Sequence, residues 1–156
     1  MTETRVRRLR VVAGALVVAV ALAGCSPFEM DPGVMRELDE EVASWDLTSA
    51  GEVIAECSDS AALGAQYHYT LVLRGEEAWR GVQQQLADAG FEPRLAEYND
   101  DERASFELTD SAGTWWSAGM NLTQGDATTS SYCGHTDAEV GDTSVGLIAV
   151  PGEESR

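Results

Sequence analysis

The stretch Gly64–Leu73, which reads Gly-Ala-Gln-Tyr-His-Tyr-Thr-Leu-Val-Leu, decides the fold expected of this chain. Larger apolar residues recur at every second position, which is the spacing that places side chains on one face of a β-strand. One side carries Ala65, Tyr67, Tyr69, Leu71 and Leu73, and the other carries Gln66, His68, Thr70 and Val72. After Gly75 the period changes, because apolar residues recur three or four positions apart until Gly90, a residue that commonly ends helices. The segment therefore predicts a strand at 64–73 followed by a helix at 75–90.

Similar patterns extend in both directions from this pair. A helix is predicted from Pro32 to Trp45, with Asp31 as its cap. Further strands are predicted at 52–57, 91–97, 103–109, 114–123 and 143–150, with a turn at 58–60 and an edge position for the strand that contains Pro93. Short connections favour antiparallel pairing. The predicted fold class is α+β: a two-layer sandwich with a mainly antiparallel sheet of about five to six strands and two helices on one face.

The N-terminus has the order of a bacterial lipoprotein signal. Four arginines lie within residues 5–10, an apolar run spans Val11–Ala23, and Leu22-Ala23-Gly24-Cys25 follows. This segment resembles the lipobox of bacterial lipoproteins, and the apolar run is short for a membrane span. The resemblance implies that Cys25 is lipidated and becomes the first mature residue, which places the protein on the outer face of the cell membrane. The alternative is an uncleaved N-terminal anchor with Cys25 as an ordinary cysteine.

This interpretation divides the chain into a signal peptide at 1–24, a lipidated tether at 25–30, one domain at 31–151 and a disordered tail at 152–156. The whole chain has a net charge of −17, with ten arginines and no lysine. After residue 24, six arginines and 26 acidic residues remain, so the mature formal charge is −20. Such a chain repels the phosphate backbone, so we expect no nucleic-acid partner.

Three cysteines are present, and lipidation of Cys25 leaves Cys57 and Cys133 as a pair. A location outside the cytoplasm permits a disulfide between them. The alternatives are two free thiols or a metal pair, for which His135 is the one histidine near Cys133.

No catalytic, nucleotide or metal-binding motif is found in the sequence, so we expect a non-enzymatic protein without a cofactor. His68 in its strand is interpreted as structural, and His135 as an exposed loop residue. The run Asn99–Glu102 lacks the glycine and the terminal glutamate of a calcium-binding loop, and a solvated turn is the simpler interpretation. Adjacent acids carry little information about catalysis in so acidic a chain.

Trp115-Trp116 gives the best indication of a binding surface. Consecutive strand residues point to opposite faces, so one tryptophan is expected in the core and Trp115 on the other face. That face is predicted to carry Trp115, His68, Thr70, Ser117, Asn121 and Thr123. A mixed aromatic and polar surface suits a protein, a peptide or a glycan. The alternative is that Trp115 packs under the loop at 124–142.

The mature part is also similar to small actinobacterial lipoproteins of the LppA-like kind. The similarity rests on the N-terminal helix, the cysteine-bearing strand and the pattern Trp79-x-x-Val82-x-x-x-Leu86 followed by Gly90-Phe91. Members of that kind are largely of unassigned function, so the resemblance implies no site residues. The leading hypothesis is a lipid-anchored, non-enzymatic binding or interaction module. A carrier of small apolar ligands between helices and sheet, and a carboxylate-based hydrolase, are the alternatives.

Overall fold

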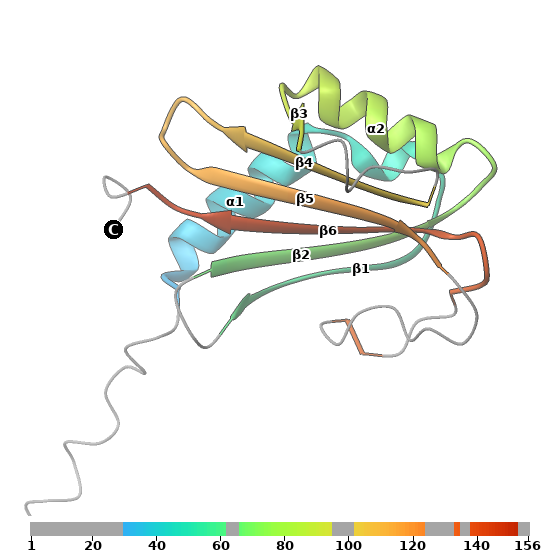
Figure 1. Cartoon of the computed structure of the whole chain (residues 1–156). Helices are drawn as coiled ribbons and strands as arrows, with labels where there is room; N and C mark the ends of the chain where they lie inside the picture. The colour runs from blue at the N-terminus through green and yellow to red at the C-terminus, as the bar shows by residue number, and fades with distance from the viewer. Residues whose placement is uncertain (1–29, 62–65, 95–101, 124–132, 135–137, 153–156) are drawn as a thin grey trace, which may run out of the picture.

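One open sheet with two helices on one face makes up the computed structural model, which describes residues 30–61, 66–94, 102–123, 133–134 and 138–152 (Figure 1). The helices are α1 (Pro32–Ser44) and α2 (Ala78–Asp88), with a short 3-10 turn, η1 (Leu47–Ala50). The strands are β1 (Glu52–Ala61), β2 (Gln66–Arg74), β3 (Glu92–Pro93), β4 (Arg103–Thr109), β5 (Trp115–Leu122) and β6 (Thr143–Val150). This arrangement confirms the predicted α+β sandwich.

The strand order is β1-β2-β6-β5-β4-β3, and every neighbouring pair is antiparallel. The last strand of the chain, β6, thus lies between the β1–β2 hairpin and the β4–β5 hairpin. Gly146 of β6 pairs with Thr70 of β2 on one side and with Gly119 of β5 on the other. Because β6 is long and central, it holds the two hairpins in a single register.

The core lies between the helices and the inner face of the sheet. Leu38 and Val42 of α1 and Val82 and Leu86 of α2 are buried there. They pack against buried residues that occupy alternate positions along each strand and so share the inner face of the sheet. These residues are Tyr67, Tyr69, Leu71, Leu73, Ala104, Phe106, Trp116, Ala118, Met120, Val145, Leu147 and Ala149. The predicted periodicity therefore assigns the correct side chains to the inner face.

Two strand predictions need correction. β1 continues to Ala61 instead of ending at Cys57, since Ser58 and Ser60, which sequence assigned to a turn, pair with Tyr69 and Tyr67 of β2. Pairing with a buried neighbour outweighs the turn preference of serine and aspartate. Of the strand predicted at 91–97, the described residues 91–94 contain the two-residue strand β3, which lies at the edge of the sheet as Pro93 predicts, and residues 95–97 lie outside the described part.

α1 begins directly after the predicted capping residue. Asp31 caps α1, as its side chain accepts a hydrogen bond from Gly33 N at 2.7 Å. Met30 is buried in the core, so the packed domain begins one residue inside the predicted tether. Residues 1–29 and 153–156 lie outside the described residues, as do Cys25 and the loop residues 95–101, 124–132 and 135–137, so the signal, lipidation and tail stay predictions.

Candidate binding face

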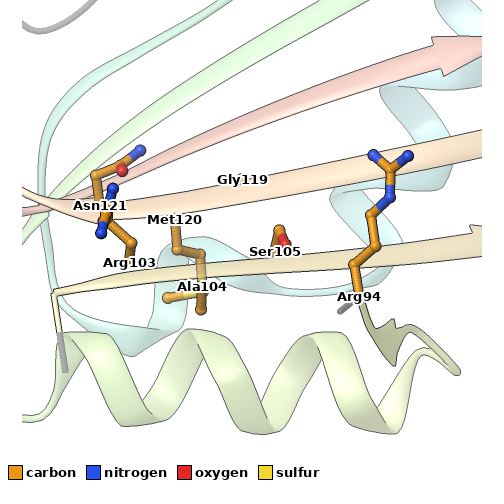
Figure 2. A pocket seen from close by; sticks show the side chains of 7 residues that line it. All are labelled: Arg94, Arg103, Ala104, Ser105, Gly119, Met120 and Asn121. Atoms are coloured by element: carbon orange, nitrogen blue, oxygen red, sulfur yellow. The ribbon is translucent and has the colours of Figure 1, made fainter. Parts of the chain in front are cut away.

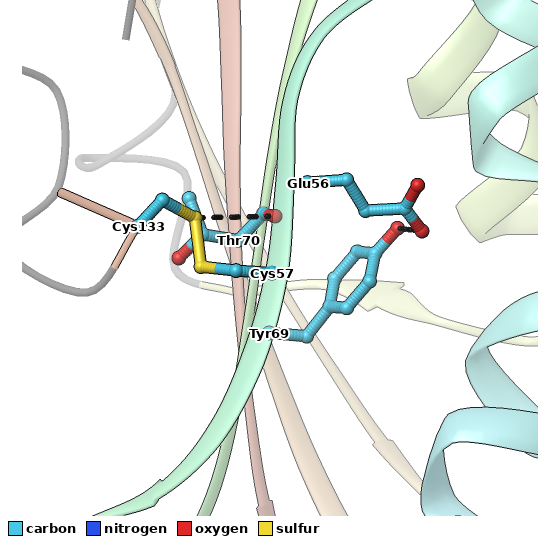
Figure 3. Close-up of a disulfide and its surroundings, with 5 residues drawn as sticks. All are labelled: Glu56, Cys57, Tyr69, Thr70 and Cys133. Atoms are coloured by element: carbon cyan, nitrogen blue, oxygen red, sulfur yellow. Dashed lines mark hydrogen bonds between the residues drawn. A yellow bond between two sulfur atoms is a disulfide. The ribbon is translucent and has the colours of Figure 1, made fainter. Parts of the chain in front are cut away.

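The predicted cysteine pair forms a disulfide. Cys57 of β1 and Cys133 are bonded, with their Cα atoms 5.5 Å apart. Cys57 pairs with Thr70 across the β1–β2 ladder, and Cys133 Sγ lies 3.9 Å from the carbonyl oxygen of Thr70 (Figure 3). The disulfide therefore holds Cys133 against the outer face of β1 and β2, the face that points away from the helices.

The structure places the predicted binding residues on this outer face but leaves only part of them accessible. His68 and Thr70 of β2 are 8% and 5% exposed, so they are buried beside the disulfide. Thr123 is also buried, and its hydroxyl donates to the Asp142 carbonyl oxygen at 2.9 Å. Trp115 and Ser117 of β5 are half-buried, whereas Asn121 is exposed. The accessible part of the predicted face is thus the β5 side, and the β2 side is closed.

A groove of about 530 Å³ lies in the open half of this face. Its floor is the backbone of β4 and β5, where Gly119 pairs with Ser105 and contributes no side chain. Arg94 at the end of β3, Arg103 and Ser105 of β4, and Asn121 of β5 line it (Figure 2). The sequence prediction included Asn121 but neither arginine. Arg94 directly follows β3 and reaches the groove only because β3 pairs with β4.

Trp115 lies beside a second, smaller recess on the same half of the sheet. This recess of about 360 Å³ is lined by Trp115, Glu107, Thr109, Leu108, Glu92 and Gly90. Arg94 Nε is 3.5 Å from Glu107 Oε2, so an ion pair separates the recess from the groove. The open half-face, defined here as the outer surface of β4 and β5 with Arg94, therefore combines an aromatic ring with charged and polar side chains.

A second ion pair lies at the end of the sheet where β2 ends and β6 begins. Arg74 donates to both carboxylate oxygens of Asp142, at 3.1 and 2.9 Å, and the Glu139 backbone N–H donates at 2.7 Å. Burial acts to raise the pKa of Asp142, but these hydrogen bonds outweigh it and hold the pKa below its ordinary value. Only the fold brings together residues 68 positions apart, so no local sequence signal indicates this pair.

The alternative functions find less support in the same geometry. The rings of Trp45, Phe91, Trp116 and Tyr67 are in edge-to-face contact and fill space that an apolar ligand would need between helices and sheet. A recess of about 260 Å³ beside α1 is lined by apolar groups together with Asp39 and Glu56, so a lipid-like ligand there would meet two carboxylates.

A carboxylate-based hydrolase needs two acids with opposed pKa shifts in one cleft. Burial, and then the adjacent Asp110 carboxyl, raise the pKa of Glu41, whereas the pKa of Asp142 is lowered. Glu41 and Asp110 lie near the β4–β5 turn, and Asp142 lies at the other end of the sheet, before β6 begins. These two acids therefore do not form the required pair.

Within the part of the chain that the structure describes, no cluster of three metal-ligating side chains is present. In the same part, no helix has the length and apolar character needed to cross a bilayer. The calcium-loop run at 99–102 lies mostly outside the described residues. Comparison with known protein families, with curated proteins and with solved structures finds no match to this chain.

Proposed function

We propose that this protein is a lipid-anchored envelope protein on the outer face of the cell membrane, and that it acts as a non-enzymatic binding module through its open half-face. The observation that carries the proposal is the division of the outer face. On the β2 side, His68 and Thr70 are buried beside the Cys57–Cys133 disulfide, while a groove of about 530 Å³ stays open over β4 and β5. An accessible groove that combines apolar surface with a few charged and polar side chains, beside a half-buried tryptophan, is typical of a recognition surface.

The anchor in this proposal rests on the lipobox-like segment and on the position of the first described residues. α1 begins at the end of the sheet where β2 starts and β6 ends (Figure 1). A tether that ends at Met30 would hold this end toward the membrane. The groove extends toward Arg103 and Asn121, which lie near the opposite end, where β4 begins and β5 ends. The proposed anchor thus presents the groove away from the bilayer.

Site-specific photo-crosslinking in the native envelope tests the proposal. A photoreactive residue at Asn121, on the open half-face, is expected to capture a discrete partner or ligand from membrane-bound protein. The same residue at Gln84, an exposed position on α2, is the matched control and is expected to capture none. A Cys25→Ser variant should leave the membrane fraction and lose the Asn121 adduct. Equal capture from both positions, or membrane retention of Cys25→Ser, would contradict the proposal.

A further inference from the structure

The groove concentrates positive charge in a strongly acidic protein. The chain has ten arginines against 27 acidic residues, yet Arg94 and Arg103 line the same groove. The Ser105 hydroxyl and the Asn121 amide lie between and beside them, on the side of the sheet away from α2 (Figure 2). Guanidinium, hydroxyl and amide groups all donate hydrogen bonds to anionic oxygens. The lining therefore favours a ligand that carries negative charge.

Glu107 does not neutralise this lining. Its contact with Arg94 is 3.5 Å long, and the two side chains are 48% and 50% exposed. Exposed ion pairs of this kind contribute little, because water and salt screen them. A guanidinium has five N–H donors in a planar fork, so one carboxylate at Nε does not exhaust it. An incoming carboxylate would therefore compete with Glu107 for Arg94.

The shape of the open half-face favours sugar rings over an extended peptide. Gly119 and its cross-strand neighbour Gly146 leave a bare backbone floor. Trp115 lies four residues before Gly119 on the same face of β5, about 13 Å away along the strand. This is the scale of a short oligosaccharide. A peptide that joins the sheet as an added strand needs a long free edge, whereas the β3 edge has two residues and includes Pro93.

We infer that the groove and the adjacent Trp115 recess bind an acidic oligosaccharide, whose carboxylates contact Arg94 and Arg103 while a sugar ring packs on Trp115. This inference rests on the proposed function and names the ligand class for the same site. The Ser105 hydroxyl and Asn121 amide supply hydrogen bonds to sugar oxygens in the groove. A lipid headgroup is less suitable, since the groove extends toward the end of the sheet opposite the start of α1 (Figure 1).

Calorimetric titration of the full mature protein with trigalacturonic acid tests this inference, with its trimethyl ester as the uncharged counterpart. Binding of the acid is expected, with binding of the ester at least about tenfold weaker. Arg94→Gln and Arg103→Gln should each weaken binding by about tenfold. Arg80→Gln is the matched control, because Arg80 is an exposed α2 arginine with its own acidic neighbour, Glu77, and should leave affinity unchanged. Glu107→Gln should tighten binding a few-fold by removing the competing carboxylate.

Equal binding of acid and ester, or affinity unchanged by both groove variants, would overturn the inference. Triglutamate and glycerol 3-phosphate distinguish the other sources of negative charge. If either binds through Arg94 and Arg103 as tightly as trigalacturonate, the glycan assignment is wrong. If trigalacturonate fails while the Asn121 photo-adduct persists, only the ligand class is wrong. If the adduct is absent as well, the proposed binding face is itself wrong.

Discussion

At the scale of single residues, two buried tyrosines of β2 make polar contacts beside an apolar core, one with α1 and one with β1. The Tyr67 hydroxyl donates to Asp39 at 2.7 Å, and the Tyr69 hydroxyl donates to Glu56 at 2.9 Å. Burial, and then these carboxylates, raise the pKa of both hydroxyls, so the tyrosines stay neutral donors. Each ring thus contributes apolar area to the core while its hydroxyl remains hydrogen-bonded. The alternation at 64–73 predicts the inward rings, but Asp39 meets Tyr67 only through the position of α1, and Glu56 meets Tyr69 only through the pairing of β1 with β2.

Glu41 gives a pH-dependent prediction at this scale. Its folded pKa is raised by burial and by Asp110, so its stabilising contribution is present below the unfolded pKa and is lost as pH rises through the folded value. Glu41→Gln should therefore stabilise the protein at pH 7 by about 0.5 kcal/mol, after allowance for screening at a partly exposed site. The gain should shrink toward zero by pH 4. Urea unfolding at both pH values measures it.

Glu37→Gln is the control for this prediction, because Glu37 is an exposed residue of the same helix. It changes the charge by the same amount away from Asp110. A Glu41→Gln stabilisation that is equal at pH 4 and pH 7, or one matched by Glu37→Gln, would contradict the assigned coupling.

At the scale of elements, the disulfide and the strand order decide which parts of the outer face stay open. The cysteine pair follows from counting cysteines once Cys25 is assigned to lipid, and the structure confirms it. The closure of His68 and Thr70 does not follow from sequence, since a polar strand face is compatible with solvent or with a covering segment. Arg94 likewise joins the groove only because β3 pairs with β4.

Loss of the disulfide is expected to destabilise the domain strongly. The bond joins residues 76 positions apart, and closing a loop of that size is worth about 4 kcal/mol in the chain-entropy model. The double variant Cys57→Ser/Cys133→Ser should lower the free energy of unfolding by about that amount, measured by urea denaturation. Hydrogen exchange of the β2 amides near Thr70 should also accelerate.

Addition of a reductant serves as the internal control for this prediction. It should reproduce the destabilisation in the unsubstituted protein and have no effect on the double variant. Identical unfolding midpoints for the oxidised and reduced protein would show that the bond does not stabilise the fold.

At the scale of the whole molecule, fold class and inner-face residues follow from the sequence, and the functional surface follows only in part. One side of the sheet is buried beneath the helices at 32–44 and 78–88. In β5 and β6 buried residues alternate with more exposed ones, as the periodicity of the sequence predicts. The predicted face correctly groups Trp115, Ser117 and Asn121 on the other side. Which half of this face stays open depends on contacts between residues far apart in the sequence. β6 lies between the two hairpins, and Cys133 is bonded to Cys57 of β1, and local sequence patterns do not predict where either lies on the sheet.

The central claim is that the open half-face is the binding surface, and filling the groove without altering charge tests it most directly. A Cβ placed at Gly119 would have only the Gly146 carbonyl oxygen nearby, at 4.0 Å, so larger residues are accommodated in the strand. The series Gly119→Ala and Gly119→Val should preserve the unfolding midpoint. Across it, capture by a photoreactive residue at Ser117 should fall progressively, by about tenfold for valine. Undiminished capture by folded Gly119→Val protein would contradict the account.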